Sequence, residues 1–333
     1  MKIVSVIGTR PQFIKAYPIS RELKRRGIGE IVIHTGQHYD YNMSGVFFSQ
    51  LNIPKPDYNL GIKSISNTRQ VALMMQSLER ILVRKKPDLL LTYGDTNSTL
   101  AGALCAAHAN IKIAHVEAGL RSYNKNMPEE INRILTDNVS DFLFCPTDIA
   151  ATNLKKENIE RGIFKSGDTM YDLYLEKKDL IMSKRNLLKK LNIRSKKYYL
   201  LTLHRPHNVD DRYSLKKLLN IINKLDSIVV FPVHPRTFKE IKKINLKLNN
   251  IKLLPPQSYL DMLTLEKNAL IIFTDSGGVQ KEAYFSKTPC ITLREETEWI
   301  ETVSSGWNIV AGSEEKKILN AVKIMLPIYH EMS

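Results

Sequence analysis

The stretch from Ile271 to Ala283, I-I-F-T-D-S-G-G-V-Q-K-E-A, joins an apolar β-type run, two adjacent glycines and a helix-compatible pattern. It predicts a strand, a tight turn and a helix that begins near Ser276. The first N–H groups of a helix are unpaired and its dipole is positive there, so a phosphate can bind unless a side chain blocks it. Gly277 and Gly278 remove that block. An ordinary strand-to-helix turn with a serine cap explains D-S-G-G equally well.

Charged residues also follow the other apolar runs, directly or within the next helix. In the N-terminal half these residues are Arg10, Lys15, Asp95, Glu117, Glu129 and Arg133. In the C-terminal half they are His204, Arg205, His234, Arg236 and Glu282. Singly, each has a structural interpretation: Asp95 as a helix N-cap, Glu117 and Arg121 as a local salt bridge, and His204 as a packed core histidine. Together they indicate a binding site at the carboxyl ends of the strands, because open α/β sheets bind ligands there.

The elements that must position these residues alternate along the chain. Short β-type runs occupy residues 2–8, 30–36, 88–94, 111–117 and 141–146, with a helix ending near Arg26 and another near Val46. A second series occupies residues 198–204, 228–234, 250–254, 270–275 and 290–293. This alternation predicts an α/β chain with two Rossmann-like domains, each a doubly wound parallel sheet. We assign residues 1–167 to the N-terminal domain and residues 168–333 to the C-terminal domain.

The composition is that of a globular chain with room for two cores. Of its 333 residues 43% are hydrophobic and 25% charged, and the length exceeds what single cores usually reach. No run of apolar residues is long enough to span a membrane, and the N-terminus reads as a strand and not as a signal peptide. The three cysteines are widely spaced, so we expect reduced thiols in the cytoplasm.

The net charge of +15 allows a nucleic-acid or acidic-membrane partner. The basic residues crowd into residues 184–197 and 236–247, where leucine and isoleucine at helical spacing favour solvated amphipathic faces. We therefore expect no nucleic-acid and no membrane partner, and keep nucleic-acid binding as an alternative.

The charged residues divide into two chemical groups. Arg10, Arg205, Arg236 and the helix N-terminus after Ser276 suit a diphosphate, and Glu282 is near enough to reach a ribose diol. Asp95, Glu117 and Glu129, with His204, are residues of the kind that move protons. No C-x-x-C pair occurs and no G-x-G-x-x-G follows a strand, so we expect neither a metal nor a nicotinamide cofactor.

Seven motifs in the same order give the chain a strong resemblance to a known family. They read G-T-R-P-x-x-I-K, Y-G-D-T-N-S-T, H-V-E-A-G-L-R, P-E-E-I-N-R-x-L-T-D, L-H-R, P-V-H-P-R and T-D-S-G-G-V-Q-K-E-A. The chain resembles the non-hydrolysing UDP-N-acetylglucosamine 2-epimerases along nearly its whole length. Pro11 in the first motif distinguishes it from the hydrolysing relatives, which carry G-T-R-A-D. The resemblance implies a GT-B fold with a UDP-sugar in the cleft between two Rossmann-like domains.

The resemblance also implies a reaction and residue roles. The reaction is reversible inversion at C2 of the sugar, by elimination of UDP and its re-addition, in making precursors of surface polysaccharides. Asp95, Glu117 and Glu129 would be acid/base carboxylates, assisted by His204, and which of the carboxylates takes the C2 proton stays open. The UDP-sugar would be bound by Arg10, Lys15, Arg133, Arg205, His234, Arg236, Ser276, Gly277, Gly278 and Glu282. We expect a homodimer.

Three departures from the family pattern concern substrate and closure. His207 replaces a usual glutamate, and the usual T-E-R-P-E segment reads T-E-W-I-E, with Trp299 in place of the arginine. With residues 34–40, this variant is more similar to the branch that acts on UDP-2,3-diacetamido-2,3-dideoxyglucuronate, which is the alternative substrate. A GT-B glycosyltransferase is a more distant alternative. The chain stops at Ser333, before the family's glycine-rich segment and terminal helix, so we expect impaired closure, stability or activity unless something replaces them.

Overall fold

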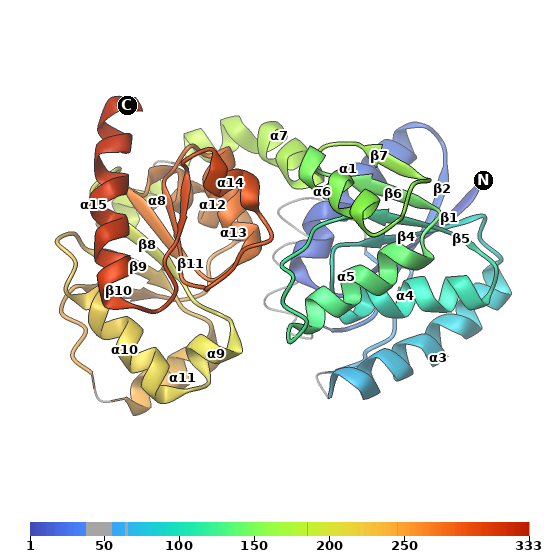
Figure 1. Cartoon of the computed structure of the whole chain (residues 1–333), viewed down its shortest axis with the longest axis horizontal. Coiled ribbons are helices and arrows are strands. Elements are labelled where there is room, and N and C mark those ends of the chain that lie inside the picture. The colour runs from blue at the N-terminus through green and yellow to red at the C-terminus, as the bar shows by residue number, and fades with distance from the viewer. Residues whose placement is uncertain (38–54, 64–65, 185, 245, 333) are drawn as a thin grey trace. The chain divides into compact units, whose positions relative to one another are not determined.

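The computed structural model describes residues 1–37, 55–63, 66–184, 186–244 and 246–332 (Figure 1). The chain divides into two compact units, Met1–Leu175 (unit 1) and Glu176–Ser333 (unit 2). The helix predicted near Val46 lies outside the described residues, and so do residues 38–40 of the segment 34–40.

Unit 1 contains a parallel sheet whose described strands follow the order β3-β2-β1-β4-β5-β6-β7. The strands are β1 (Lys2–Ile7), β2 (Gly29–His34), β3 (Tyr58–Asn59), β4 (Leu89–Tyr93), β5 (Lys112–Val116), β6 (Phe142–Cys145) and β7 (Ile163–Lys165). The helices are α1 (Arg10–Arg25), α3 (Asn67–Lys85), α4 (Asn97–His108), α5 (Pro128–Val139) and α6 (Asp148–Lys156), and α7 (Thr169–Ser183) continues into unit 2. One apolar cluster joins the sheet to α3 and α4, and another joins it to α1, so both faces are covered.

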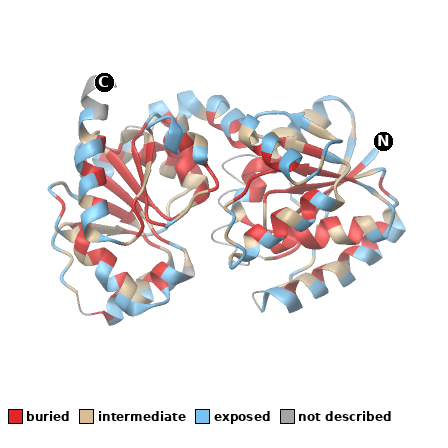
Figure 2. Cartoon of the chain, viewed as in Figure 1, coloured by how far each residue is buried: buried red, intermediate tan, exposed pale blue. Residues whose placement is uncertain are grey.

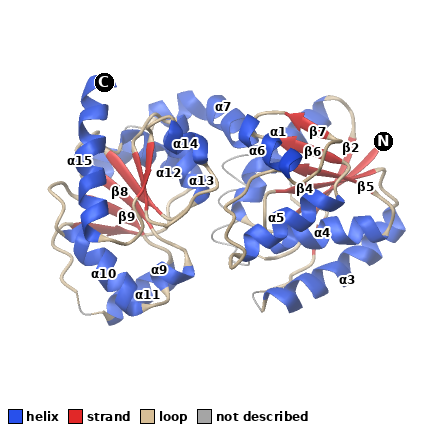
Figure 3. Cartoon of the chain, viewed as in Figure 1, coloured by secondary structure: helices blue, strands red, loops and turns tan. Residues whose placement is uncertain are grey.

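Unit 2 repeats this plan with the strand order β10-β9-β8-β11-β12-β13 among the described residues, again parallel throughout. The strands are β8 (Tyr199–Thr202), β9 (Val229–Pro232), β10 (Ile251–Leu254), β11 (Ile271–Thr274), β12 (Cys290–Thr292) and β13 (Asn308–Val310). The helices are α8 (Asn186–Lys190), α9 (Pro206–Val209), α10 (Arg212–Asn223), α11 (Pro235–Lys243), α12 (Tyr259–Asn268), α13 (Gly277–Phe285), α14 (Ile300–Ser304) and α15 (Glu315–Met332). Figure 3 shows helices against both faces of this sheet.

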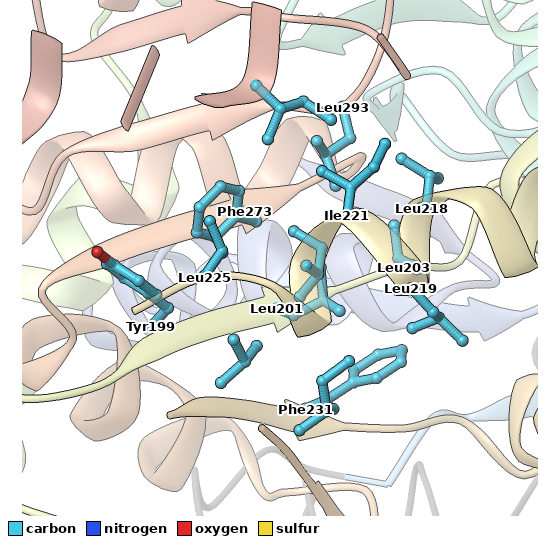
Figure 4. Close-up of a cluster of buried hydrophobic side chains, with 14 of the residues drawn as sticks. Tyr199, Leu201, Leu203, Leu218, Leu219, Ile221, Leu225, Phe231, Phe273 and Leu293 are labelled. Carbon is cyan, nitrogen blue, oxygen red and sulfur yellow. The ribbon is translucent and has the colours of Figure 1, made fainter. Parts of the chain in front are cut away.

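The strands of unit 2 are apolar on both faces, because alternate residues enter two separate cores. Tyr199, Leu201 and Phe273 pack with α10 and α15 on one face, and the Tyr199 and Phe273 rings meet edge to face with centroids 5.6 Å apart (Figure 4). Leu200 and Ile272 enter a second core with α8 and α12. Figure 2 shows the strands as the most buried part of each unit. Burial on both faces is what turns these runs into central strands of a parallel sheet.

The strand order reverses direction once in each sheet, and this reversal decides where loops diverge. In unit 1 the reversal lies between β1 and β4, and in unit 2 between β8 and β11. Loops leave the carboxyl ends of such neighbouring strands toward opposite faces, so a crevice opens there. The predicted doubly wound parallel sheets are confirmed.

The sequence did not predict three edge elements, and one predicted feature is wrong. β3, β7 and β13 are only two or three residues long, too short for an apolar run to stand out. The basic stretch at residues 184–197 was expected to form an amphipathic helix, but its described part holds only the five-residue helix α8. The second basic stretch, at residues 236–247, does lie largely in a helix, α11.

Cys105, Cys145 and Cys290 are all buried and unpaired with one another. Burial raises the pKa of the Cys105 thiol to about 11 and that of Cys145 to about 12. Neither thiol is therefore in its nucleophilic thiolate form near neutral pH.

Gly162 should be far less tolerant of a side chain than another glycine with a similar backbone. Gly162 has a φ of +72°, and an added Cβ would lie 2.1 Å from the carbonyl oxygen of Asp141. Gly27 has a φ of +67° and nothing within 4 Å of such an atom. We expect Gly27→Ala to cost about 1 kcal/mol of unfolding free energy and Gly162→Ala at least about 2 kcal/mol more. Urea unfolding of both variants measures this, and equal losses would contradict it.

Candidate active site

Lys15 and Glu117 form a nearly buried ion pair that joins α1 to the loop after β5. Both side chains are only 9% exposed, and Lys15 Nζ contacts Glu117 Oε1. The turn after β4 lies against this pair, since a Cβ on Gly94 would stand 2.8 Å from Lys15 Nζ. Gly94 also has a φ of +64°, which only glycine adopts freely. Glycine at this position therefore lets the turn that precedes Asp95 lie against the pair.

Glu117 adopts a strained backbone conformation. Its φ is +76°, a region that few residues other than glycine occupy. The N–H groups of Glu117 and Ala118 both donate to the carbonyl of Phe144, at 3.0 and 3.1 Å, and so fix the turn. Strain of this kind gathers at functional sites, which supports the predicted importance of Glu117.

Asp95 is held by Arg133, which comes from α5. Arg133 donates to Asp95 Oδ2 at 2.7 Å and to Glu130 Oε2 at 2.5 Å. The Arg133 side chain is 2% exposed and that of Asp95 27% exposed. The arginine thus orients a carboxylate that keeps contact with solvent. The contact predicted between Arg133 and the substrate stays a prediction.

The first turn of α5 carries two glutamates with different surroundings. Glu130 is fully buried and accepts the backbone N–H groups of Ser122 and Tyr123 at 3.0 and 2.8 Å. Glu129 is half-buried. Glu130 thus supports the preceding loop, whereas Glu129 remains the candidate for acid/base chemistry.

The structural interpretations of three predicted site residues are wrong. The N-cap of α4 is Thr96, not Asp95. Arg121 pairs with two other carboxylates at 2.7 and 2.6 Å, and Glu117 pairs with a lysine. The His204 side chain is 53% exposed, so it is no packed core histidine.

Asp275 organises the corresponding edge of unit 2. It is fully buried and accepts the backbone N–H groups of His204 and Arg205, each at 3.0 Å, and the side-chain amide of Asn208 at 3.0 Å. His204 Nδ1 lies 2.9 Å from Asp275 Oδ1. Burial raises the pKa of Asp275, but the bonds and charge of His204, with the other donors, lower it to about 2. The sequence analysis noted the D-S-G-G turn but gave Asp275 no role, although it is the first charged residue after the run I-I-F-T.

The strand, turn and helix predicted at Ile271–Ala283 are present. Ser276 is the N-cap of α13, and its hydroxyl accepts from Val279 N at 3.4 Å. A Cβ on Gly277 would lie 2.2 Å from Oε1 of Glu298, so Gly277 admits a carboxylate of the following loop. That role differs from the predicted one of clearing space for a phosphate, which remains a prediction.

The loop after β12 and the first turns of α13 are packed tightly together. Lys281 is 3% exposed and Glu282 7% exposed. Lys281 Nζ lies 4.3 Å from the centroid of the Trp299 ring, a cation–π distance. Trp299, one of the departures from the family pattern, is thus a buried partner of the residue next to Glu282.

The remaining residues predicted to bind the UDP-sugar do not all lie at one place. Arg205 reaches the Ser276 turn through the bond of its backbone N–H to Asp275. Arg236 lies after β9, one strand further along, where its side chain is 64% exposed and pairs with Asp210 at 2.6 Å. His234 caps α11 by accepting from Arg236 N at 3.2 Å. Arg10 is the half-buried first residue of α1.

Metal and membrane features are absent from the part of the chain that the structure describes. No three histidine, cysteine, aspartate or glutamate side chains gather there as they do around a metal ion. None of its helices is both long and apolar enough to cross a bilayer.

Two Rossmann-like units, each with polar side chains near the reversal of its strand order, are typical of the GT-B class of nucleotide-sugar proteins. The chain belongs to the UDP-N-acetylglucosamine 2-epimerase family, whose model matches residues 21–333. The predicted fold class and the predicted family are both confirmed.

Individual relatives are similar along almost the whole chain. A UDP-N-acetylglucosamine 2-epimerase homolog from Methanococcus maripaludis is 53% identical, covering 98% of this chain and 93% of the relative. UDP-2,3-diacetamido-2,3-dideoxy-D-glucuronate 2-epimerase from Pseudomonas aeruginosa is 44% identical over 98% and 92% of the two chains. The crystal structure of Methanocaldococcus jannaschii UDP-GlcNAc 2-epimerase in complex with UDP-GlcNAc and UDP superposes with a TM-score of 0.92, at 46% identity, over 98% of this chain and 93% of that one.

Asp275 should contribute stability that disappears in acid. Its pKa is lowered from 3.8 to about 2 in the folded chain. A carboxyl with a depressed folded pKa stabilises the fold above its unfolded pKa and loses that contribution as the pH falls toward the folded value. We expect Asp275→Asn to cost about 2 kcal/mol at pH 6 and about half of that near pH 3.

Denaturant unfolding of the wild type and the variant across this pH range measures the change. Asp148→Asn, at a carboxylate that is 83% exposed, is the control and should show little difference at either pH. A loss for Asp275→Asn that stays constant from pH 6 to pH 3 would contradict the expectation.

Proposed function

We propose that this chain is a UDP-sugar 2-epimerase that inverts C2 of UDP-N-acetylglucosamine to give UDP-N-acetylmannosamine. The observation that carries the proposal is that Asp95 and Glu117 follow the neighbouring strands β4 and β5 of unit 1, each paired with a cation. Membership of the family supports it. So does the M. jannaschii relative, whose structure holds UDP-GlcNAc and UDP.

The reaction needs a base and a way to stabilise a departing anion. A base removes the C2 proton, the electron pair forms the C1–C2 double bond, and the C1–O bond breaks to release UDP. Protonation of C2 on the opposite face and re-addition of UDP at C1 complete the inversion. We assign the proton transfers to Asp95, Glu117 and Glu129, with His204 assisting proton transfer or stabilising the leaving group.

The ion pairs of unit 1 suit this role. The ammonium of Lys15 offsets the cost of burying the Glu117 carboxylate. Asp95, held by Arg133 but 27% exposed, can exchange protons with a bound sugar.

Retention of UDP is assigned mainly to unit 2. The N-terminus of α13, with Ser276, Gly277 and Gly278, offers backbone N–H groups to the diphosphate, and Glu282 is suited to the ribose diol. Arginine side chains, Arg10 and Arg205 among them, add positive charge. UDP that stays bound during the glycal intermediate can add back, which separates epimerisation from hydrolysis.

UDP-2,3-diacetamido-2,3-dideoxyglucuronate is the alternative substrate for the same chemistry. The P. aeruginosa relative is a 2-epimerase for this sugar nucleotide, and Trp299 replaces an arginine of the usual family motif. We further propose that the chain works as a homodimer in the cytoplasm, on the route to surface polysaccharides.

Deuterium incorporation separates these possibilities. The protein is incubated in deuterated water with each UDP-sugar in turn, and deuterium at C2 is measured by mass spectrometry and NMR. We expect incorporation and epimer formation with one of the two. Absence of C2 deuterium in both would overturn the proposal, and sugar transfer to an acceptor without exchange would favour a glycosyltransferase.

The assigned roles predict different kinetic defects. Asp95→Asn and Glu117→Gln should each lower turnover by about 100-fold or more with UDP affinity nearly intact, because they remove proton transfer. Asp148→Asn removes a carboxylate that is 83% exposed and should leave turnover unchanged. Unaltered turnover in both site variants would remove their proposed roles.

Glu282→Ala should instead weaken UDP binding by about tenfold or more, because it removes a contact that is made with the bound nucleotide itself. Isothermal titration with UDP measures it. An unchanged dissociation constant would exclude the ribose contact.

A further inference from the structure

His115 is a fully buried histidine on β5, two residues before Glu117, and both of its ring nitrogens have close partners. Nε2 lies 2.7 Å from the carbonyl oxygen of Gly94. Nδ1 lies 2.6 Å from Oδ1 of Asp137, which comes from α5. The His115 and Asp137 side chains are both 0% exposed. This arrangement was not predicted from the sequence.

The partners of His115 define its protonation. A backbone carbonyl only accepts, so Nε2 carries a proton. The other oxygen of Asp137 accepts the N–H of Gly119 at 3.1 Å and a guanidinium N–H of Arg121 at 2.7 Å. Burial raises the pKa of Asp137, but His115 and Arg121 lower it further, so the net shift is downward. An ionised carboxylate also only accepts, so Asp137 holds the other side of the ring through its contact with Nδ1.

Arg121 extends this network. It also donates to Glu157 at 2.7 and 2.6 Å, so His115, Asp137, Arg121 and Glu157 form one connected chain. Buried ionic networks add little net stability compared with an apolar core, but they enforce one geometry, because each broken contact leaves a buried charge or dipole without a partner.

The geometry that His115 enforces is that of the turn before Asp95. The N–H of Gly94 donates to the carbonyl of Val116 at 2.9 Å, and its own carbonyl accepts from His115. Both sides of this peptide turn are therefore fixed to β5. The same residue, Gly94, faces the Lys15–Glu117 pair, so movement of the turn would shift Asp95 relative to Glu117.

We propose that His115 is a positioning residue for the C2 proton transfer: its hydrogen bond to the Gly94 carbonyl, braced by Asp137, sets the placement of Asp95 against the Lys15–Glu117 pair. The inference rests on the proposed function. His115 itself does not touch the reacting atoms. Misplacement of a reacting group by about 1 Å can lower a rate about 100-fold, so a buried brace of this kind affects turnover and not nucleotide binding.

Two variants of His115 separate positioning from a merely structural role. The amide nitrogen of glutamine can reach the place of Nε2, so His115→Gln keeps the donor to Gly94. The amide nitrogen of asparagine can reach the place of Nδ1, so His115→Asn keeps the donor to Asp137 and loses the one to Gly94. We expect His115→Asn to lower kcat about 100-fold with KM and UDP affinity within about threefold, and His115→Gln to restore at least about tenfold of that loss.

Equal kcat values for the two variants at equal thermal stability would overturn the proposal, and so would a loss confined to KM. Asp141→Asn is the matched control, because it alters a carboxylate that accepts from Ile113 N at the opposite end of β5. It should leave kcat unchanged. If His115→Asn does not fold, the protonation of the ring nitrogens in the wild type tests the proposal instead.

NMR of the ring nitrogens in the full-length wild type supplies a readout that needs no activity. We expect Nε2 of His115 to carry a proton, assigned by the signal that disappears in His115→Gln. A ring whose Nε2 carries no proton would overturn the proposal. Wild-type protein without C2 exchange would refute the proposed function while this signal still reports on His115, so the two failures are distinguishable.

Discussion

Neutralisation of buried carboxylates is the constraint on which both strand edges depend. Glu117, Glu130, Asp137 and Asp275 all lie at or near the carboxyl ends of strands with little or no exposure, and each contacts a cation or several N–H donors. An ionised carboxylate buried without such partners costs several kcal/mol. Removing one partner of a buried pair typically costs about 3–5 kcal/mol. The positions of these acids therefore fix the positions of the basic residues around them.

The parallel sheets determine where the polar side chains of each site lie. The central strands are largely apolar on both faces, and the order reversal in each sheet opens a crevice at the carboxyl ends of the strands beside it. Candidate side chains follow the strands beside the reversal, as Asp95 follows β4 and His204 follows β8, and also the next strands, as Glu117 follows β5. Unit 1 carries the carboxylates proposed for proton transfer, and unit 2 carries the N-terminus of α13, which suits an anion.

The sequence predicts the central strands and the residues at their carboxyl ends well, but it predicts poorly which side chains pair with one another. Runs such as I-I-F-T predict central strands, and Ser276 followed by two glycines predicts the start of a helix, because these signals are local. The pairing of Asp95 with Arg133 depends on how α5 crosses the sheet, which no local pattern specifies. His115 and Asp137 are 22 positions apart and look like an ordinary strand residue and an ordinary helix residue. Edge strands such as β13 are short, so their periodicity carries little information.

The burial of all three cysteines has a practical consequence for spectroscopy. Thiol-directed dyes react with exposed thiolates, and Cys105, Cys145 and Cys290 are neither exposed nor readily ionised. We therefore expect little labelling of the native cysteines. One cysteine introduced on the surface of each unit would accept a donor and an acceptor dye without removal of any native thiol. The separation of the two units could then be followed by fluorescence transfer while UDP is added.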